Sequence, residues 1–221
     1  MGIGKAWGIL FGSGDSTKKT LKAMLFSIIP IINVISHGYA VELMGNAARG
    51  KEEMPAWGSG WDLFVKGFSA SMLYFAYLVI PFFLRMAINL FTESDLLSFL
   101  AYLLYLVFLF SVPMSVAFYS ATDKWGEAFS FSSSMSRIKP VFKKYLGAFV
   151  LNTIFLLIAE IIVEVIILTV GRVPLLRWTL TSLLNFFVLI TFYYVYGSIY
   201  YLIPGNQNSE ADTADTAATA G

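Results

Sequence analysis

The sequence predicts an all-α fold: a polytopic integral membrane protein whose helices pack as a bundle. Hydrophobic residues make up 57% of the 221 residues and charged residues only 13%, about half the charged share of a soluble domain. The mean hydropathy of +0.71 is typical of a chain that lies largely in lipid. Four apolar runs also reach the ~20 residues that are needed to cross a bilayer.

The four runs are predicted to be membrane-spanning helices. They lie at residues 67–91, 96–120, 141–170 and 173–204. The run at 141–170 is almost unbroken and gives the clearest signal of the four. The stretches 50–66 and 121–140 are less apolar, and we expect them to form interfacial pieces at the edge of the membrane.

Both ends of the chain are polar. Residues 1–20 are expected to be a polar entry, with a helix that begins near Thr17. The transmembrane helical domain then covers residues 21–204. The tail, residues 205–221, has few large apolar groups and is expected to be disordered.

The first apolar segment, residues 21–48, is interrupted by Pro30 and by several polar residues. It is either one kinked transmembrane helix or a broken, re-entrant hairpin that turns near Pro30–Asn33. The distribution of Lys and Arg favours the hairpin, because cytoplasmic loops are enriched in both. If the segment crosses, the two sides hold nearly equal numbers; if it returns, 12 lie on one side and 2 on the other, with Arg85 inside the membrane. We therefore expect a multi-pass protein of the cell membrane with its Lys/Arg-rich loops and N-terminus in the cytoplasm.

The order of membrane segment, interfacial stretch and span occurs twice along the chain. Pro30 precedes Gly67 by 37 residues, and Pro113 precedes Gly147 by 34 residues. Internal repeats are common in membrane proteins. We consider an internal duplication on this basis.

The stretch from Ile29 to Phe68 carries a distinctive pattern of proline, glycine and tryptophan. The pattern comprises Pro30, Asn33, Gly38-Tyr39, Gly50, Pro55-x-Trp57, Trp61 and Gly67. With it, the chain resembles a family of prokaryotic multi-pass membrane proteins catalogued only as a domain of unknown function. The resemblance covers most of residues 21–202 and implies the helical membrane architecture. The family has no established activity, so the resemblance implies no substrate, cofactor or site residue.

Three charged residues lie deep inside predicted spans. Arg85, Glu160 and Glu164 are at similar depths along their helices, and the two glutamates share a helix face because they are four residues apart. Charged groups in a membrane usually pair or line a wet cavity. We expect Arg85 to pair with one or both carboxylates, with Arg172 and Arg177 near enough to reach Glu164. The cluster is then either an ion pair that fixes packing or a proton- or cation-binding site.

Two further sets of residues are candidates. Asn33, His37 and Glu42 form a polar site in the first segment, which is either a satisfied polar pair or a proton relay. Trp57, Trp61 and Trp125 lie in the interfacial stretches, where tryptophan commonly anchors a protein at headgroup level. Tyrosines toward the end of the last span are interpreted as residues of the same aromatic belt.

The sequence offers no chemistry for an enzyme. It has no Cys and a single His, and none of the familiar catalytic motifs occurs. We therefore expect no catalytic residue, no metal site, no cofactor and no nucleic-acid partner. The expected role is a non-enzymatic scaffold or accessory subunit whose partners are membrane lipid, other membrane proteins or further copies of the chain. The alternative is a small-solute or ion transporter or channel that uses Arg85, Glu160 and Glu164.

Overall fold

The computed structural model describes residues 2–91, 94–170 and 173–206, and their regular secondary structure is helical, with no strand among them. Four of the helices are long and apolar enough to cross a membrane, which confirms the predicted fold class. They are α4 (Gly60–Phe91), α5 (Asp95–Thr122), α8 (Phe142–Val170) and α9 (Pro174–Tyr201). Of the tail predicted to be disordered, 205–221, all but Gly205 and Asn206 lies outside the described residues.

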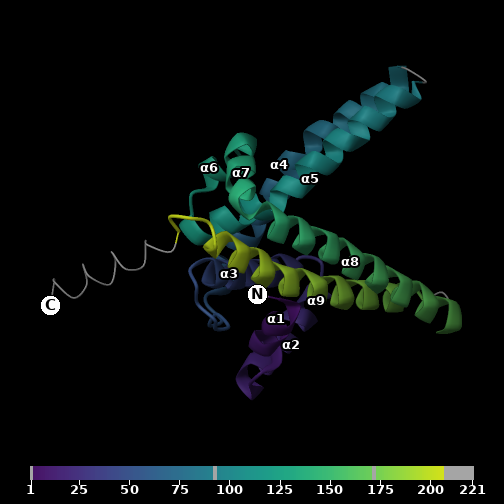
Figure 1. Ribbon diagram of the computed structural model, residues 1–221. Coiled ribbons are helices and arrows are strands. Elements are labelled where there is room, and N and C mark those ends of the chain that lie inside the picture. Colours follow the sequence, from purple (N-terminus) through teal and green to yellow (C-terminus); the bar gives the residue numbers. More distant parts are fainter. Residues whose placement is uncertain (1, 92–93, 171–172, 207–221) are drawn as a thin grey trace.

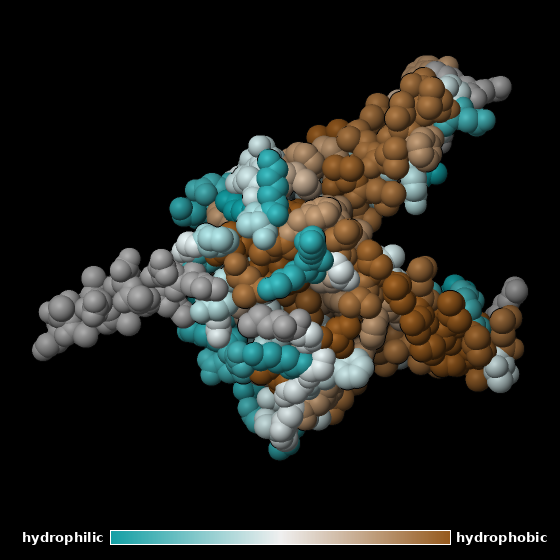
Figure 2. All heavy atoms as spheres, in the orientation of Figure 1, coloured by the Kyte–Doolittle hydropathy of each residue, from teal (hydrophilic) through white to brown (hydrophobic). Residues whose placement is uncertain are grey.

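The four long helices form two hairpins that diverge like the prongs of a fork (Figure 1). Helices α4 and α5 pack against each other, and α8 packs against α9. Figure 2 shows apolar residues covering the visible surface of both prongs, while polar residues gather around the base. Only 17–28% of the most apolar windows of these helices is buried. Most of their side chains therefore face outward, as expected for helices that lie in lipid.

The short helix α3 (Asn33–Ala48) holds the two prongs together. It contacts α4, α5 and α9, and it is buried along most of its length. The contact with α4 is close because glycine faces glycine: a Cβ atom added to Gly38 would lie 1.7 Å from the carbonyl oxygen of Leu63, and one added to Gly67 would lie 1.9 Å from that of Val34. Small residues of this kind let helix backbones approach within a membrane. Gly45 gives α3 a similar approach to α5, and Gly197 of α9 gives one to α3.

The first apolar segment is broken, as predicted. Helix α2 (Gly14–Ser27) ends before Pro30, and α3 begins after it. The hydroxyl of Ser36 donates a hydrogen bond to the carbonyl oxygen of Ala23 at 2.9 Å, so the chain has folded back on itself. Its turn lies beside the beginning of α9, where the indole of Trp178 donates to the carbonyl oxygen of Ile28 at 2.7 Å. The segment therefore enters from the base, runs along α9 and returns to the base.

The polar entry predicted for residues 1–20 was wrong in part. Helix α1 (Ile3–Phe11) buries Ala6 and Leu10, and it packs on α9. Helix α2 begins at Gly14, ahead of the predicted start near Thr17, because the hydroxyl of Ser13 accepts a hydrogen bond from the helix N-terminus. Four glycines in the first twelve residues conceal the short amphipathic pattern of α1.

The two predicted interfacial stretches lie at the base. The first is a loop that gives way to α4 at Gly60, seven residues before the predicted start of the span. The second contains α6 (Trp125–Ala128), α7 (Phe131–Ile138) and the 3-10 turn η1 (Lys139–Val141). A buried set of hydroxyls fastens α7 to the first hairpin: Ser134 lies 2.6 Å from Ser115 and 3.2 Å from Tyr77. Both stretches therefore pack against the helical bundle.

The proposed duplication remains a prediction, and the two halves use their glycines differently. Gly67 lies in the close crossing of α3 and α4. Its counterpart Gly147 has open space around the position of a Cβ atom.

Candidate functional site

The predicted cluster of Arg85, Glu160 and Glu164 is not formed. Arg85 lies on α4 and the glutamates on α8, and the two hairpins diverge between them (Figure 1). The guanidinium of Arg85 instead lies 5.9 Å from the ring centre of Tyr102, within its own hairpin. The prediction compared depths along the helices, and depth does not determine which helices are neighbours.

Each carboxylate has a partner within the second hairpin. Glu164 forms an ion pair with Arg177, as predicted. Arg172, the other predicted partner, lies outside the described residues. Glu160 accepts a hydrogen bond of 3.0 Å from the side-chain amide of Asn185. These contacts tie α8 to α9 at two heights along the prong.

Cysteine pairs provide a test of this rearrangement, because the chain has no Cys of its own. We expect the pair Glu164→Cys and Arg177→Cys to be linked efficiently by a short bis-maleimide. The pair Arg85→Cys and Glu164→Cys should give only background linking within one chain, since its members lie on different prongs. The measurement is the yield of linked peptide by mass spectrometry. Equal yields from the two pairs would contradict the fork.

The second predicted site, formed by Asn33, His37 and Glu42, does not come together as one site. The imidazole of His37 contacts the hydroxyl of Tyr193 at 2.5 Å and that of Ser71 at 3.1 Å. Glu42, in contrast, pairs with Lys66 on α4 at 3.5 Å. Asn33 stays near His37, because both line a small cavity between α3 and α9. His37 and Glu42 therefore have different partners, and no proton relay connects them.

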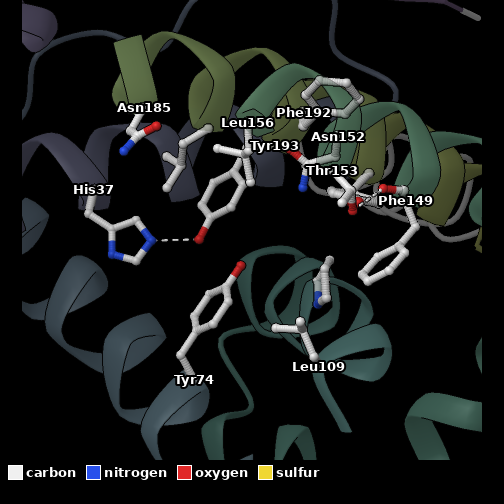
Figure 3. Close-up of a pocket in the computed structure, with 13 residues that line it drawn as sticks. His37, Tyr74, Leu109, Phe149, Asn152, Thr153, Leu156, Asn185, Phe192 and Tyr193 are labelled. Atoms are coloured by element: carbon white, nitrogen blue, oxygen red, sulfur yellow. Dashed lines mark hydrogen bonds between the residues drawn. The ribbon is translucent and has the colours of Figure 1, made fainter. Parts of the chain in front are cut away.

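A larger cavity lies where the two hairpins separate (Figure 3). We call it the root cavity. It has a volume of about 430 Å³, and its walls come from α3 and all four long helices. Its polar lining residues are His37, Tyr74, Asn152, Thr153, Asn185, Tyr193 and Tyr196. In Figure 3 the hydroxyls of Tyr74 and Tyr193 point toward each other beside the ring of His37.

The electrostatics of the root cavity are neutral. Among the described residues, its lining contains no Lys, Arg, Asp or Glu. Burial lowers the pKa of His37, on the non-spanning helix α3, to about 4. The imidazole is therefore uncharged at neutral pH. It can donate one hydrogen bond and accept another.

The three predicted tryptophan anchors differ in environment. Trp57 is stacked on Tyr39, with ring centres 4.4 Å apart, and the ammonium of Lys22 lies 4.4 Å from its ring centre. It therefore packs against the base of the protein. Trp61 and Trp125 are 69% and 43% exposed. That exposure suits an anchor at the membrane surface.

Comparison with protein-family profiles shows which family the chain belongs to. A family profile described as "Protein of unknown function (DUF4013)" matches residues 23–168, which is most of the chain. The chain belongs to the DUF4013 family. The resemblance predicted from the pattern around Pro30 and Trp57 is thereby confirmed. The comparison with curated proteins gives no significant match, and neither does that with solved structures.

The DUF4013 match ends within α8, so it leaves out α9 and that helix's share of the root cavity. Sequence reasoning missed this cavity, although α9 carried a signal for it. Asn185, Leu189, Phe192 and Tyr196 follow one another at intervals of three or four residues and so share a helix face. The interpretation of the tyrosines in this helix as membrane-belt residues is wrong for Tyr193, Tyr194, Tyr196 and Tyr200, because all four are buried.

Proposed function

We propose that this DUF4013 protein is a non-enzymatic scaffold or accessory subunit of the cell membrane. The observation that supports the proposal is the fork. Beyond the base, the described part of the α4–α5 prong packs only on itself, and its large apolar side chains stay exposed. Phe83 and Phe99, for example, are 55% and 57% exposed. Such a prong presents two helix faces to a helix of another membrane protein, or of a second copy of the chain.

The chemistry of the root cavity also favours a role without catalysis. Its polar groups are amides, hydroxyls and a neutral imidazole. Within the described part of the chain, neither the hydroxyls nor the imidazole contacts a carboxylate that would activate it as a nucleophile or base. Asn185 does touch Glu160, but an amide is not activated in this way. The transport alternative depended on Arg85 lying beside Glu160 and Glu164, and it loses its basis because the prongs hold them apart.

The distribution of cations supports one orientation of the proposed scaffold in the membrane. Lys5 pairs with Glu52 at the base, Lys22 lies over Trp57, and Lys66, near the start of α4, pairs with Glu42. Arg177 lies at the far end, near the start of α9. Positive residues are enriched on the cytoplasmic side of membrane proteins. This pattern supports a cytoplasmic base.

A photo-crosslinking amino acid at Phe83 tests the scaffold role in living cells. We expect the chain to be crosslinked to one other protein, which gives an adduct of a single, discrete mass. That other protein should be a membrane protein or a second copy of the chain. Phe68, 48% exposed at the base of the same helix, is the matched control position. It should give lipid adducts alone. Lipid adducts alone at Phe83 as well would overturn the proposal.

A further inference from the structure

The two prongs flank a space that begins at the root cavity and widens away from it. We call this space the fork gap. Tyr74 of α4 and Phe149 of α8 line the root cavity from the two hairpins (Figure 3). Beyond the cavity the prongs separate, and Figure 2 shows open space between them. Side chains that continue the cavity-lining faces of α4 and α8 toward the tips therefore line the fork gap.

One charged residue on each prong faces the fork gap. Arg85 follows Tyr74 by 11 residues, and Glu160 follows Phe149 by the same number. Eleven residues make about three turns of an α-helix, so each charged residue lies on the cavity-lining face of its helix, ~16 Å further along the prong. Both side chains are exposed. They therefore stand on opposite walls of the gap, at similar distances beyond the root cavity.

The contacts of the two side chains support this placement. The guanidinium of Arg85 lies 5.9 Å from the ring centre of Tyr102. Tyr102 precedes the cavity-lining Leu109 of α5 by seven residues, about two turns, so it shares that face. Glu160 accepts its hydrogen bond from Asn185, which lines the root cavity from α9. Each charge therefore contacts a neighbour on the gap-facing side of its own hairpin.

Neither charge is neutralised within the described part of the chain. The ion pairs among these residues include neither Arg85 nor Glu160. A cation 5.9 Å from a ring centre is at the outer limit of a cation–π contact. A carboxylate can accept about four hydrogen bonds, and the amide of Asn185 supplies one without any charge. Ionisable groups within a membrane are costly and usually pair with one another. Arg85 therefore calls for a carboxylate, and Glu160 for a cation.

We propose that the fork gap receives a transmembrane helix of another protein, which carries a carboxylate toward Arg85 and a lysine or arginine toward Glu160. A helix is ~10–12 Å across with its side chains, so it can contact two walls that do not touch each other. The wall between the root cavity and Arg85 includes Leu78 and Pro81, which suit an apolar helix. This inference rests on the proposed scaffold role and specifies the chemistry of the partner.

The charges also argue against a second copy of the chain as the occupant. The partner helix needs both signs of charge at one level. Among the described residues, α4 carries Arg85 at this level, whereas α8 carries only Glu160 and Glu164. No single described span of this chain therefore supplies both groups.

The test measures binding of synthetic transmembrane peptides to the full chain in phosphatidylcholine vesicles, by energy transfer from a donor dye to an acceptor on the peptide. Because the chain has no Cys, Ser209→Cys in the tail provides one position for the donor. The charged peptide is a leucine–alanine helix with one Glu and, two residues later, one Lys, which point to nearly opposite sides. The neutral peptide has Gln at both positions. We expect the charged peptide to bind about tenfold more tightly.

Charge reversal identifies the residues responsible. Arg85→Glu places two carboxylates in the fork gap and should weaken binding of the charged peptide about tenfold. Adding Glu160→Arg should restore binding, because the peptide can turn by half a rotation about its axis. Lys143→Glu is the matched control: it reverses an exposed charge at the start of α8, outside the gap, and should change binding by less than about twofold.

Equal binding of the two peptides to the unaltered chain overturns the proposal, and this comparison needs no variant that could fail to fold. A double variant that binds no better than Arg85→Glu also overturns it. So does displacement of the charged peptide by unlabelled copies of the chain, because a second copy would then be the occupant. The scaffold role is judged separately at Phe83, which lies two residues from Arg85 and so on the opposite side of α4. A discrete protein adduct there would uphold the scaffold even if the fork gap binds no helix.

Discussion

Gly38→Ala should destabilise the protein by about 3 kcal/mol or more, at the upper end of what overpacking costs. The added methyl group would lie 1.7 Å from the carbonyl oxygen of Leu63 and 3.0 Å from the backbone nitrogen of Gly67. Both contacts are with backbone, which cannot swing aside as a side chain would. Helices α3 and α4 would have to separate, and α3 is the helix that holds the two prongs together.

Gly147→Ala is the matched control, and its effect should have the opposite sign. Gly147 also lies inside a long helix, but nothing stands within 4 Å of its missing Cβ atom. Alanine there should stabilise the helix by roughly 0.5–1 kcal/mol. Thermal unfolding of both variants in detergent measures the difference. A Gly38→Ala protein that melts at or above the temperature of Gly147→Ala would refute the close crossing.

Acidification should destabilise the protein through His37 by about 2 kcal/mol at pH 5. Burial lowers its folded-state pKa from 6.5 to about 4, so between these values the unfolded chain binds a proton that the folded chain does not. The stabilisation is therefore complete above pH 6.5 and is lost as the pH falls toward 4.

Because His37 is the only histidine in the chain, a substitution at this position removes all histidine titration. His37→Gln keeps hydrogen-bonding groups at the position and removes the titration. Its melting temperature should stay nearly constant from pH 7 to pH 5, while that of the unaltered protein falls. Parallel decreases in the two proteins would show that another group is responsible.

The sequence predicted the long helices well, because their signal is local. Twenty or more apolar residues in a row can lie in lipid only as a helix, whatever their neighbours are. The break at Pro30 was predicted for the same reason, since proline and the polar residues after it interrupt the pattern locally. Both predictions follow from properties that can be read within a window of the chain.

The site could not be predicted in the same way, because it depends on which helices are neighbours. The run at 141–170 dominates the sequence, yet the helix that holds the fold together is α3, which is shorter and less regular. Its importance lies in the backbone contacts of Gly38 and Gly45, and the pattern of residues does not show what they touch. The same holds for Arg85. The sequence indicated how deep it lies along its helix, but it did not indicate which side chain lies next to it.

The position of α3 along the chain has a consequence for how the protein is made. Helix α3 is complete at Ala48, but Gly197, which packs against it from α9, is synthesised about 150 residues later. At about 5–20 residues per second, the ribosome needs on the order of ten seconds to bridge that interval. Throughout it, the face of α3 that Gly197 will cover is bare. That contact can therefore form only after α4, α5 and α8 have all been synthesised.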